Sequence, residues 1–257
     1  MRAAFLWFYV VCIFLSSCQK ETLLPDLKGS LVGYVYTFDE FSNQLEDRSD
    51  VLVTARGLKD YTAYTDKAGR FELTGLPTGT YELILSKPGF GTMKQFGIKH
   101  LGGTPTILGL NLSPGANCSG FFLYQVPETK IVELSVENDS LSATFGFKDN
   151  ISNQMSLQVY LSDLPGFSIT EAKKLISCYL LRSDDKFKGA FNYKSAGFDP
   201  GKKIYFKACI LNRKSAVYDF GSRIVVGIDS YFDYTTYTTV YPNLGDESAQ
   251  FSFVVPQ

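Results

Sequence analysis

Histidine is almost absent from the 257-residue chain, which contains only His100. A Ser-His-Asp or Cys-His catalytic group would have to use this residue, and the sequence has no Gly-x-Ser-x-Gly nucleophile elbow to accompany it. A stable zinc site needs three or four Cys or His ligands, and the few cysteines have no short spacing. We therefore expect no metal site and no nucleophilic enzyme, and we predict that His100 is a partly exposed turn residue.

Motifs for nucleotides and nucleic acids are also missing. The glycines form neither a Gly-x-Gly-x-x-Gly fingerprint nor a Walker loop. The 25 Lys and Arg residues nearly balance the 26 Asp and Glu residues, so the formal net charge is −1, and no block of basic residues occurs. A nucleic-acid-binding surface would need such a block. We predict no cofactor and no nucleic-acid partner.

Pairs of carboxylates are the remaining route to catalysis, because glycoside hydrolysis uses two of them. The candidate pairs are Glu46-Asp47, Asp184-Asp185 and Asp246-Glu247, all among turn residues where solvated charge is the ordinary explanation. The segment 149–153 offers oxygen ligands for calcium but lacks the EF-hand register, and Asn/Asp turn chemistry accounts for the same residues. We predict that the chain is not an enzyme, with a carboxylate-based glycoside hydrolase as the less favoured alternative.

The N-terminus has the layout of a signal peptide, which we assign to residues 1–17. Arg2 precedes an unbroken apolar run from Ala3 to Leu15, and small polar residues follow it. As a helix the run would extend about 20 Å, which is too short for a hydrocarbon core of roughly 30 Å. It is therefore expected to direct export and not to anchor the protein.

Residues 15–18, Leu-Ser-Ser-Cys, resemble the lipobox of bacterial lipoproteins. The resemblance implies that the mature chain begins at Cys18, that Cys18 carries acyl chains, and that the protein is held at the outer membrane, on its periplasmic or its cell-surface face. Two or three acyl chains make such an attachment effectively permanent. Residues 18–27 would form the tether. The alternative is an ordinary secretory signal that happens to contain a cysteine.

The aromatic content is high, with 16 Tyr and 21 Phe, and it suits half-buried strands. We predict an all-β fold of two tandem β-sandwich domains. A single segment favours a short helix, Ser168 to Cys178, because Ser168 and Glu171 stand at capping-box spacing.

The first domain is expected over residues 28–113, where seven short alternating runs are separated by turn residues. Asp66 and Gly69 suit a tight turn, and the segment from Leu76 to Gly79 suits a second one. We expect the strands on either side of this second turn to pair. The predicted runs are Leu31–Thr37, Val51–Ala55, Thr62–Thr65, Arg70–Leu76, Thr80–Ser86, Met93–Ile98 and Thr106–Leu112.

Residues 65–73 (Thr-Asp-Lys-Ala-Gly-Arg-Phe-Glu-Leu) and 75–83 carry a resemblance to a known family. Together with 33–35 (Gly-Tyr-Val) and 87–90 (Lys-Pro-Gly-Phe), they resemble the carboxypeptidase regulatory-like domain. That domain is a prealbumin-type sandwich of seven strands. The resemblance implies a non-catalytic accessory module, and the zinc-binding spacing of the peptidase itself is absent.

The second domain is expected over residues 114–257, with strands at Ile131–Glu137, Ser142–Phe147, Ser156–Ser162, Lys188–Tyr193, Lys203–Asn212 and Gln250–Val255. Residues 198–212 resemble the E-F corner and F strand of bacterial fibronectin type III domains. The resemblance makes Pro200-Gly201 the corner, Tyr205 the tyrosine-corner residue and Asn212 the start of the following turn. An aromatic-rich insertion near 213–245 departs from that pattern, and we interpret it as an added hairpin or an elaborated F-G loop.

Three cysteines, Cys118, Cys178 and Cys209, remain after the signal peptide and the lipidated residue are set aside. An odd number cannot pair fully within one chain. Cys178 with Cys209 is the disulfide to test in an oxidising envelope, since both fall in one predicted domain. The alternative is that all three are small buried apolar residues.

The segment Tyr231–Tyr241 is unusually rich in aromatic residues. Strict alternation would place rings on both faces. Tyr231, Tyr234 and Tyr237, beside Asp233, are therefore candidates to stack on sugars or to anchor a protein partner. The alternative is that one face packs into the sandwich and its rings are core residues.

Together these features predict a non-catalytic envelope or cell-surface lipoprotein that acts as a binding or adhesion module. Its partners would be the membrane, through the lipid anchor, and a glycan or a surface protein. The alternative is a structural subunit of a surface fibre or of a nutrient-uptake complex.

Overall fold

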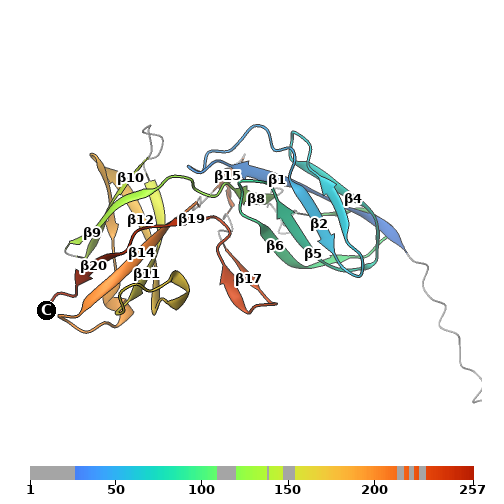
Figure 1. Cartoon of the computed structure of the whole chain (residues 1–257). Helices are drawn as coiled ribbons and strands as arrows, with labels where there is room; N and C mark the ends of the chain where they lie inside the picture. The colour runs from blue at the N-terminus through green and yellow to red at the C-terminus, as the bar shows by residue number, and fades with distance from the viewer. Residues whose placement is uncertain are drawn as a thin grey trace, which may run out of the picture.

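The computed structural model describes residues 27–108, 120–137, 139–146, 154–212, 217–219, 223–225 and 230–257. The signal peptide, Cys18, Cys118 and the segment 149–153 lie outside these ranges. Within them every regular element is a strand, apart from two 3₁₀ turns at Ile169–Glu171 and Tyr193–Ala196, so the predicted all-β class is confirmed. No helix in the described ranges is long and apolar enough to cross a membrane. Figure 1 shows two units arranged end to end.

The first unit is a sandwich of two four-stranded sheets. One sheet has the order β4-β1-β7, with β8 also paired to β1, and the other has the order β3-β2-β5-β6. Alternate side chains point inward and bury Leu31, Val35, Phe71, Leu83 and Leu85 between the sheets. The strands are β1 Lys28–Phe38, β2 Leu52–Arg56, β3 Tyr61–Tyr64, β4 Arg70–Pro77, β5 Gly79–Ser86, β6 Met93–His100, β7 Thr106–Ile107 and β8 Phe121–Tyr124.

The two predicted turns around β4 are present, but they lead from one sheet to the other. β4 pairs with β1, whereas β5 pairs with β2 and β6. The prediction that β4 and β5 pair with each other is therefore wrong, because a turn pattern fixes where a chain reverses and not which strand it pairs with. The inward faces were predicted well, since Phe71 and Leu83 meet in one core.

The first unit also extends further along the chain than predicted. β8 pairs in parallel with β1, and Val35 lies opposite Phe121 while Phe38 lies opposite Tyr124. The boundary therefore falls after Tyr124 and not near residue 114. Residues 109–119, which suggested a linker, lie outside the described ranges.

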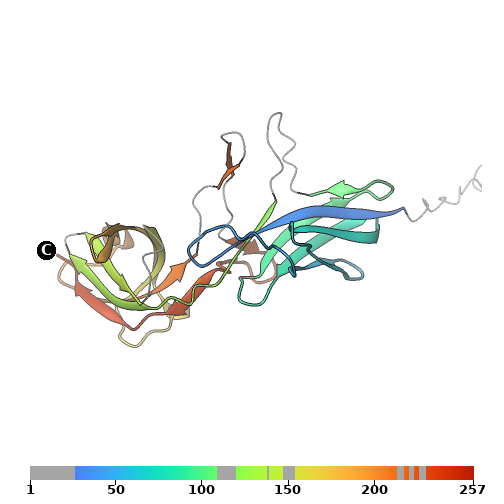
Figure 2. The ribbon, with the colours of Figure 1, turned by 90° about the horizontal axis from the view of Figure 1, so that it is seen from above.

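The second unit is one eight-stranded sheet with the order β19-β14-β11-β12-β13-β10-β9, in which β20 also pairs with β14. The sheet encloses a separate core, and Figure 2 shows how its strands curve around it. Leu157, Leu161, Leu180, Phe191 and Phe206 are among the buried members. The strands are β9 Ile131–Glu137, β10 Ser140–Phe145, β11 Gln154–Ser162, β12 Lys174–Ser183, β13 Lys186–Ala190, β14 Lys203–Leu211, β19 Leu244–Glu247 and β20 Phe251–Val254.

The predicted helix from Ser168 to Cys178 is wrong. The backbone N–H of Ser168 does donate to the Glu171 carboxylate at 2.9 Å, as a capping box requires, but only the single 3₁₀ turn Ile169–Glu171 follows. From Lys174 onward the chain forms β12 and pairs with β11. The buried Cys178 and Leu180 are two residues apart, so the period of a strand prevails over the helix-start signal.

Between β14 and β19 the chain forms two short hairpins. The first joins β15 (Val217–Asp219) to β16 (Arg223–Val225), and the second joins β17 (Tyr231–Asp233) to β18 (Thr238–Val240). The β17–β18 hairpin lies beside β6 of the first unit in Figure 1. An insertion of the second unit thus contacts the first, and this brings the predicted aromatic segment to the junction.

Candidate functional site

The aromatic segment does not continue as one strand, because it reverses after Asp233. Tyr231 pairs with Val240 and Asp233 pairs with Thr238, and residues 234–237 form the connecting turn. Tyr237 accommodates the turn with φ +54°, in the left-handed region that few non-glycine residues adopt. The predicted alternation of faces therefore ends at the turn, and residues 234–239 are all exposed.

Asp233 is buried and fully engaged by groups of the protein. One carboxylate oxygen accepts hydrogen bonds from the Thr235 backbone N–H, at 2.9 Å, and from the Thr235 hydroxyl. The other forms an ion pair with Lys94 Nζ of β6 at 3.0 Å. These contacts hold the pKa of Asp233 well below its usual value. The hydrogen bond from the Thr235 hydroxyl lowers the pKa most, followed by the bond from the Thr235 backbone N–H and then by the bond from Lys94. Asp233 thus fixes the hairpin to the first unit and does not face a ligand.

Tyr231 also serves packing. Its ring is partly buried against the core of the first unit, and its centroid is 6.5 Å from that of Phe96. Burial raises the pKa of its hydroxyl. Of the four residues proposed from the sequence, Tyr231 and Asp233 therefore hold the hairpin in place, and Tyr234 and Tyr237 remain available to a ligand.

Four rings form a contiguous surface, which we call the hairpin patch: Phe96, Phe232, Tyr234 and Tyr237. The centroid of Tyr234 is 5.4 Å from that of Phe96 and 5.1 Å from that of Phe232, and both contacts are edge to face. Tyr237 meets Phe232 in the same way at 6.4 Å. Exposure rises from 42% for Phe232 to 61% for Tyr234 and 78% for Tyr237. Sequence reasoning missed Phe96, because only the tertiary fold brings β6 to the hairpin.

A second set of contacts joins the units through Asn212, at the end of β14. Its side-chain N–H groups donate to the backbone carbonyls of Asp39 and Gln125, each at 2.7 Å. Its side-chain oxygen accepts from the Ser42 hydroxyl at 2.8 Å. Asn212 is 2% exposed. Its backbone N–H also donates to the Asn243 carbonyl, in the loop before β19. Asn212 is thus a polar link between the units, and the turn predicted to begin at this residue would involve residues 213–216, which lie outside the described ranges.

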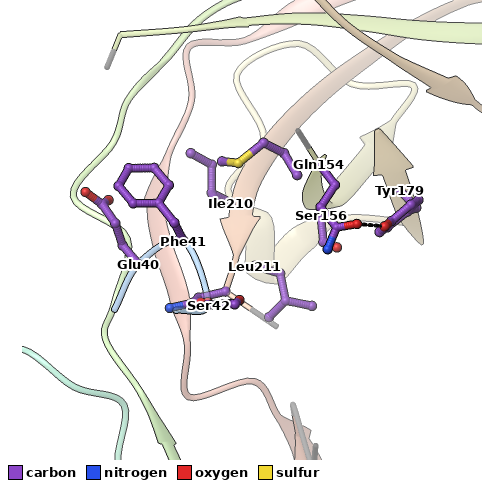
Figure 3. A pocket seen from close by; sticks show the side chains of 10 residues that line it. Glu40, Phe41, Ser42, Gln154, Ser156, Tyr179, Ile210 and Leu211 are labelled. Carbon is purple, nitrogen blue, oxygen red and sulfur yellow. Dashed lines mark hydrogen bonds between the residues drawn. The ribbon is translucent and has the colours of Figure 1, made fainter. Parts of the chain in front are cut away.

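A shallow hollow, open to solvent, lies next to this link. Figure 3 shows Glu40 and Phe41 on one side and Gln154 and Tyr179 on the other. Several of its polar side chains are already engaged: the Glu40 carboxylate accepts two backbone N–H groups at 2.9 Å, and the Tyr179 hydroxyl donates to Gln154. The hollow therefore offers a ligand less than the hairpin patch does.

His100 is buried, with 1% of its surface exposed, so its prediction as a partly exposed residue is wrong. It ends β6, where its Nδ1 lies 2.8 Å from the Thr106 hydroxyl, and its ring packs so closely on Gly29 that a Cβ there would lie 2.8 Å from it. A histidine enclosed in this way reaches no substrate, and it supports packing between β1, β6 and β7.

Cys178 and Cys209 are both free and buried, so the proposed disulfide is wrong. Cys178 lies opposite Leu157 and Cys209 lies opposite Gln158, which are neighbours on the intervening strand β11. The two cysteines are thus about 9–10 Å apart across the sheet and point to opposite faces, beyond the reach of a disulfide. Burial raises the pKa of the Cys178 thiol to about 12 and that of Cys209 to about 11.

The three carboxylate pairs lie at the surface. All six side chains are exposed, and Glu46-Asp47 belongs to the first unit. Asp246 pairs with Lys130, and Glu247 pairs with Lys207. Within the described ranges no group of three His, Cys, Asp or Glu side chains is placed to hold a metal ion. The calcium candidate at 149–153 lies outside those ranges.

No protein-family model matches the sequence, and no curated protein does. Three solved structures illustrate the structural similarities. A type II cohesin–X-dockerin complex from Acetivibrio cellulolyticus is 17% identical with a TM-score of 0.30, covering 38% of this chain and 58% of that one, so this chain spans less than two thirds of its length. A Bacteroides uniformis protein, described only provisionally as carbohydrate binding, is 12% identical with a TM-score of 0.26, covering 88% and 98%. A DUF3823 family protein from Parabacteroides merdae is 15% identical with a TM-score of 0.25, covering 72% and 90%. Scores this low carry no argument about function.

Proposed function

We propose that the chain is a non-catalytic lipoprotein of the bacterial envelope that binds a partner through the hairpin patch. The observation that carries this proposal is the cluster of exposed rings at Phe232, Tyr234 and Tyr237 on a hairpin tied to both units. Exposed aromatic residues that are held in place are typical of recognition surfaces. The buried thiols and histidine and the engaged carboxylate of Asp233 favour binding over catalysis.

The order of the strands supports the two domain types that the sequence resembles. In the first unit β1 pairs with β4 on one side and in parallel with later strands on the other, and the second sheet runs β3-β2-β5-β6, as in a prealbumin-type sandwich. In the second unit the strand orders β9-β10-β13 and β12-β11-β14, with β19 and β20, resemble the two sheets of a fibronectin type III domain, although the pairing of β12 with β13 joins them into one sheet. Both are modules that present surfaces.

The position of β1 supports display away from a membrane. β1 begins at the end of the first unit that points away from the second unit (Figure 1). Acyl chains on Cys18, shortly before β1, would therefore hold that end near the bilayer, with the hairpin patch and the second unit further out. Mass spectrometry of the native N-terminus tests the anchor: we expect an acylated Cys18, and an unacylated start elsewhere would overturn this part of the proposal.

The recognition surface is tested with the full-length protein, isolated from membranes in detergent. Arrays of microbial and host glycans and extracts of envelope proteins are the two probes. We expect binding to be lost in the double variant Tyr234→Ala/Tyr237→Ala and kept in Tyr64→Ala. Tyr64 is a matched control because it is 66% exposed but lies on β3, at the opposite edge of the sheet from β6. Binding that survives the double variant unchanged would overturn the proposed site.

A further inference from the structure

We infer that the ligand of the hairpin patch is an uncharged carbohydrate. This inference rests on the proposed function and names the chemical class that the patch suits. It depends on three observations: the neutral chemistry of the patch, the fixed position of its rings, and its size.

The patch has no free charge. Residues 234–240 include no acidic or basic side chain, and below them Lys94 is paired with Asp233 at 3.0 Å and lies 3.7 Å from Glu82. Exposed hydroxyl groups lie beside the rings instead: those of Tyr234 and Tyr237, and those of Thr236 and Thr238, which also bond each other at 2.8 Å. Each hydroxyl both donates and accepts, which matches sugar hydroxyls. Because Lys94 is already paired with carboxylates, the patch does not favour an anionic ligand.

The rings are held in position before a ligand arrives. The turn is fixed at its base, where Asp233 accepts two hydrogen bonds from Thr235 and pairs with Lys94. Phe232 contacts both exposed tyrosines edge to face, at interplanar angles of 75° and 80°. A single edge-to-face contact covers at most one face of a ring, so Tyr237 keeps a face available, and the negative face of an aromatic ring attracts the weakly positive C–H groups of a sugar. Pre-organised groups also lose little entropy on binding.

The size of the patch favours a small ligand over a protein. An aromatic side chain presents roughly 150–250 Å². At the exposures of Phe232, Tyr234 and Tyr237, the three together offer on the order of 300–450 Å². A stable protein interface takes about 800 Å² from each partner. The patch is thus about half of what one partner contributes to a protein interface, and this favours a small ligand such as a short stretch of polysaccharide.

Affinity electrophoresis of the full-length protein tests the inference. The gels contain linear glucans, xylan or mannan as neutral polysaccharides, or polygalacturonate as an acidic one. We expect at least one neutral polysaccharide to retard the protein and polygalacturonate to have no effect. The double variant Tyr234→Ala/Tyr237→Ala should bind at least about tenfold more weakly, and Tyr64→Ala should bind like the wild type. Raising the salt from about 50 to about 500 mM should change the affinity less than about twofold, since no charges are involved.

The outcomes separate this inference from the proposed function. Retardation by polygalacturonate alone, or binding that falls steeply with salt, would overturn a neutral carbohydrate while leaving the patch as the site. Failure of every neutral polysaccharide, together with capture of an envelope protein that Tyr234→Ala/Tyr237→Ala abolishes, would do the same. Retardation that is equal in the double variant and in Tyr64→Ala would overturn both. Circular dichroism of each variant confirms that a loss of binding is not a loss of folding.

Discussion

Gly69 shows how a single residue fixes the crossing between the two sheets of the first unit. Its φ of +82° closes the turn in which Asp66 accepts from the Arg70 backbone N–H at 2.9 Å. The Gly69 carbonyl then accepts from the Val35 backbone N–H at 2.8 Å. A Cβ on Gly69 would lie 2.1 Å from the Val35 carbonyl oxygen, so both conformation and space exclude a side chain.

We predict that Gly69→Ala destabilises the protein by roughly 3 kcal/mol or more, because backbone strain and a steric clash add together. The matched control is Gly89→Ala. Gly89 has a similar φ of +79°, but a Cβ there would have no atom within 4 Å, so only the strain of about 1–2 kcal/mol applies. Urea unfolding of both variants measures the difference. Equal losses would contradict the role of the Val35 contact.

The turn at Gly69 was predictable from the sequence because the residues that form a tight turn are close together in the chain. The Asp-x-x-Gly spacing and the alternating Phe71 and Leu73 lie within a few residues of one another, and the structure confirms the turn and the buried face. The burial of His100 and the role of Phe96 were missed for the opposite reason. Their surroundings come from β1, β7 and the β17–β18 hairpin, which are distant in the chain.

At the scale of elements, the β17–β18 hairpin depends on one carboxylate. Asp233 joins its own turn to Lys94 of β6, which also lies 3.7 Å from Glu82 of β5. The pKa of Lys94 is raised, mainly by the hydrogen bond to Asp233, so this cation persists over the ordinary pH range. The state of Asp233 therefore controls the attachment of the hairpin.

We predict that Asp233→Asn loosens the hairpin at neutral pH and that the effect depends on pH. The pKa of Asp233 is lowered from 3.8 in the folded protein, so the carboxylate stabilises the fold above about pH 4. This contribution is lost as the pH falls below that value towards the folded pKa. The difference in unfolding free energy between wild type and variant should thus be full at about pH 7 and smaller at about pH 3.

Urea unfolding at both pH values measures this difference, and hydrogen exchange of residues 231–240 locates it. Asp246→Asn is the matched control, since Asp246 also pairs with a lysine but is 74% exposed, where an ion pair contributes little. A pH-independent difference for Asp233→Asn, or an equal effect of Asp246→Asn, would contradict the prediction.

The elements themselves were predictable where strands alternate and turns are short, as in β1 to β6. The segment that forms β12 was predicted to be helical because Ser168 and Glu171, just before it, form a capping-box hydrogen bond. Such a bond marks where a helix can begin, but it does not determine how far the helix continues. β8 was missed because parallel pairing with β1 joins residues more than eighty positions apart, as with Val35 and Phe121, and no local pattern marks it.

At the scale of the whole molecule, the two units are joined at separate places. The β17–β18 hairpin rests on β6, and Asn212 joins β14 to the chain around Asp39 and Gln125. A third contact is steric. Gly91 lies so close to the loop between β18 and β19 that a Cβ on it would be 2.3 Å from the Pro242 carbonyl oxygen. These contacts indicate that the units unfold together, although each has its own core.

Asn212→Ala tests this coupling. The substitution removes three side-chain hydrogen bonds and leaves the carbonyls of Asp39 and Gln125 without that donor. It should therefore lower the free energy of unfolding by about 2–4 kcal/mol. Because the lost bonds join the units, calorimetry should show the single transition of the wild type broaden or divide into two. Asn192→Ala is the control, since Asn192 is exposed and its side chain forms no cap bond. If Asn212→Ala melts in one transition at the midpoint of the control, the Asn212 link contributes nothing, and the hairpin patch owes its fixed position to the Asp233–Lys94 pair and to the packing of Tyr231.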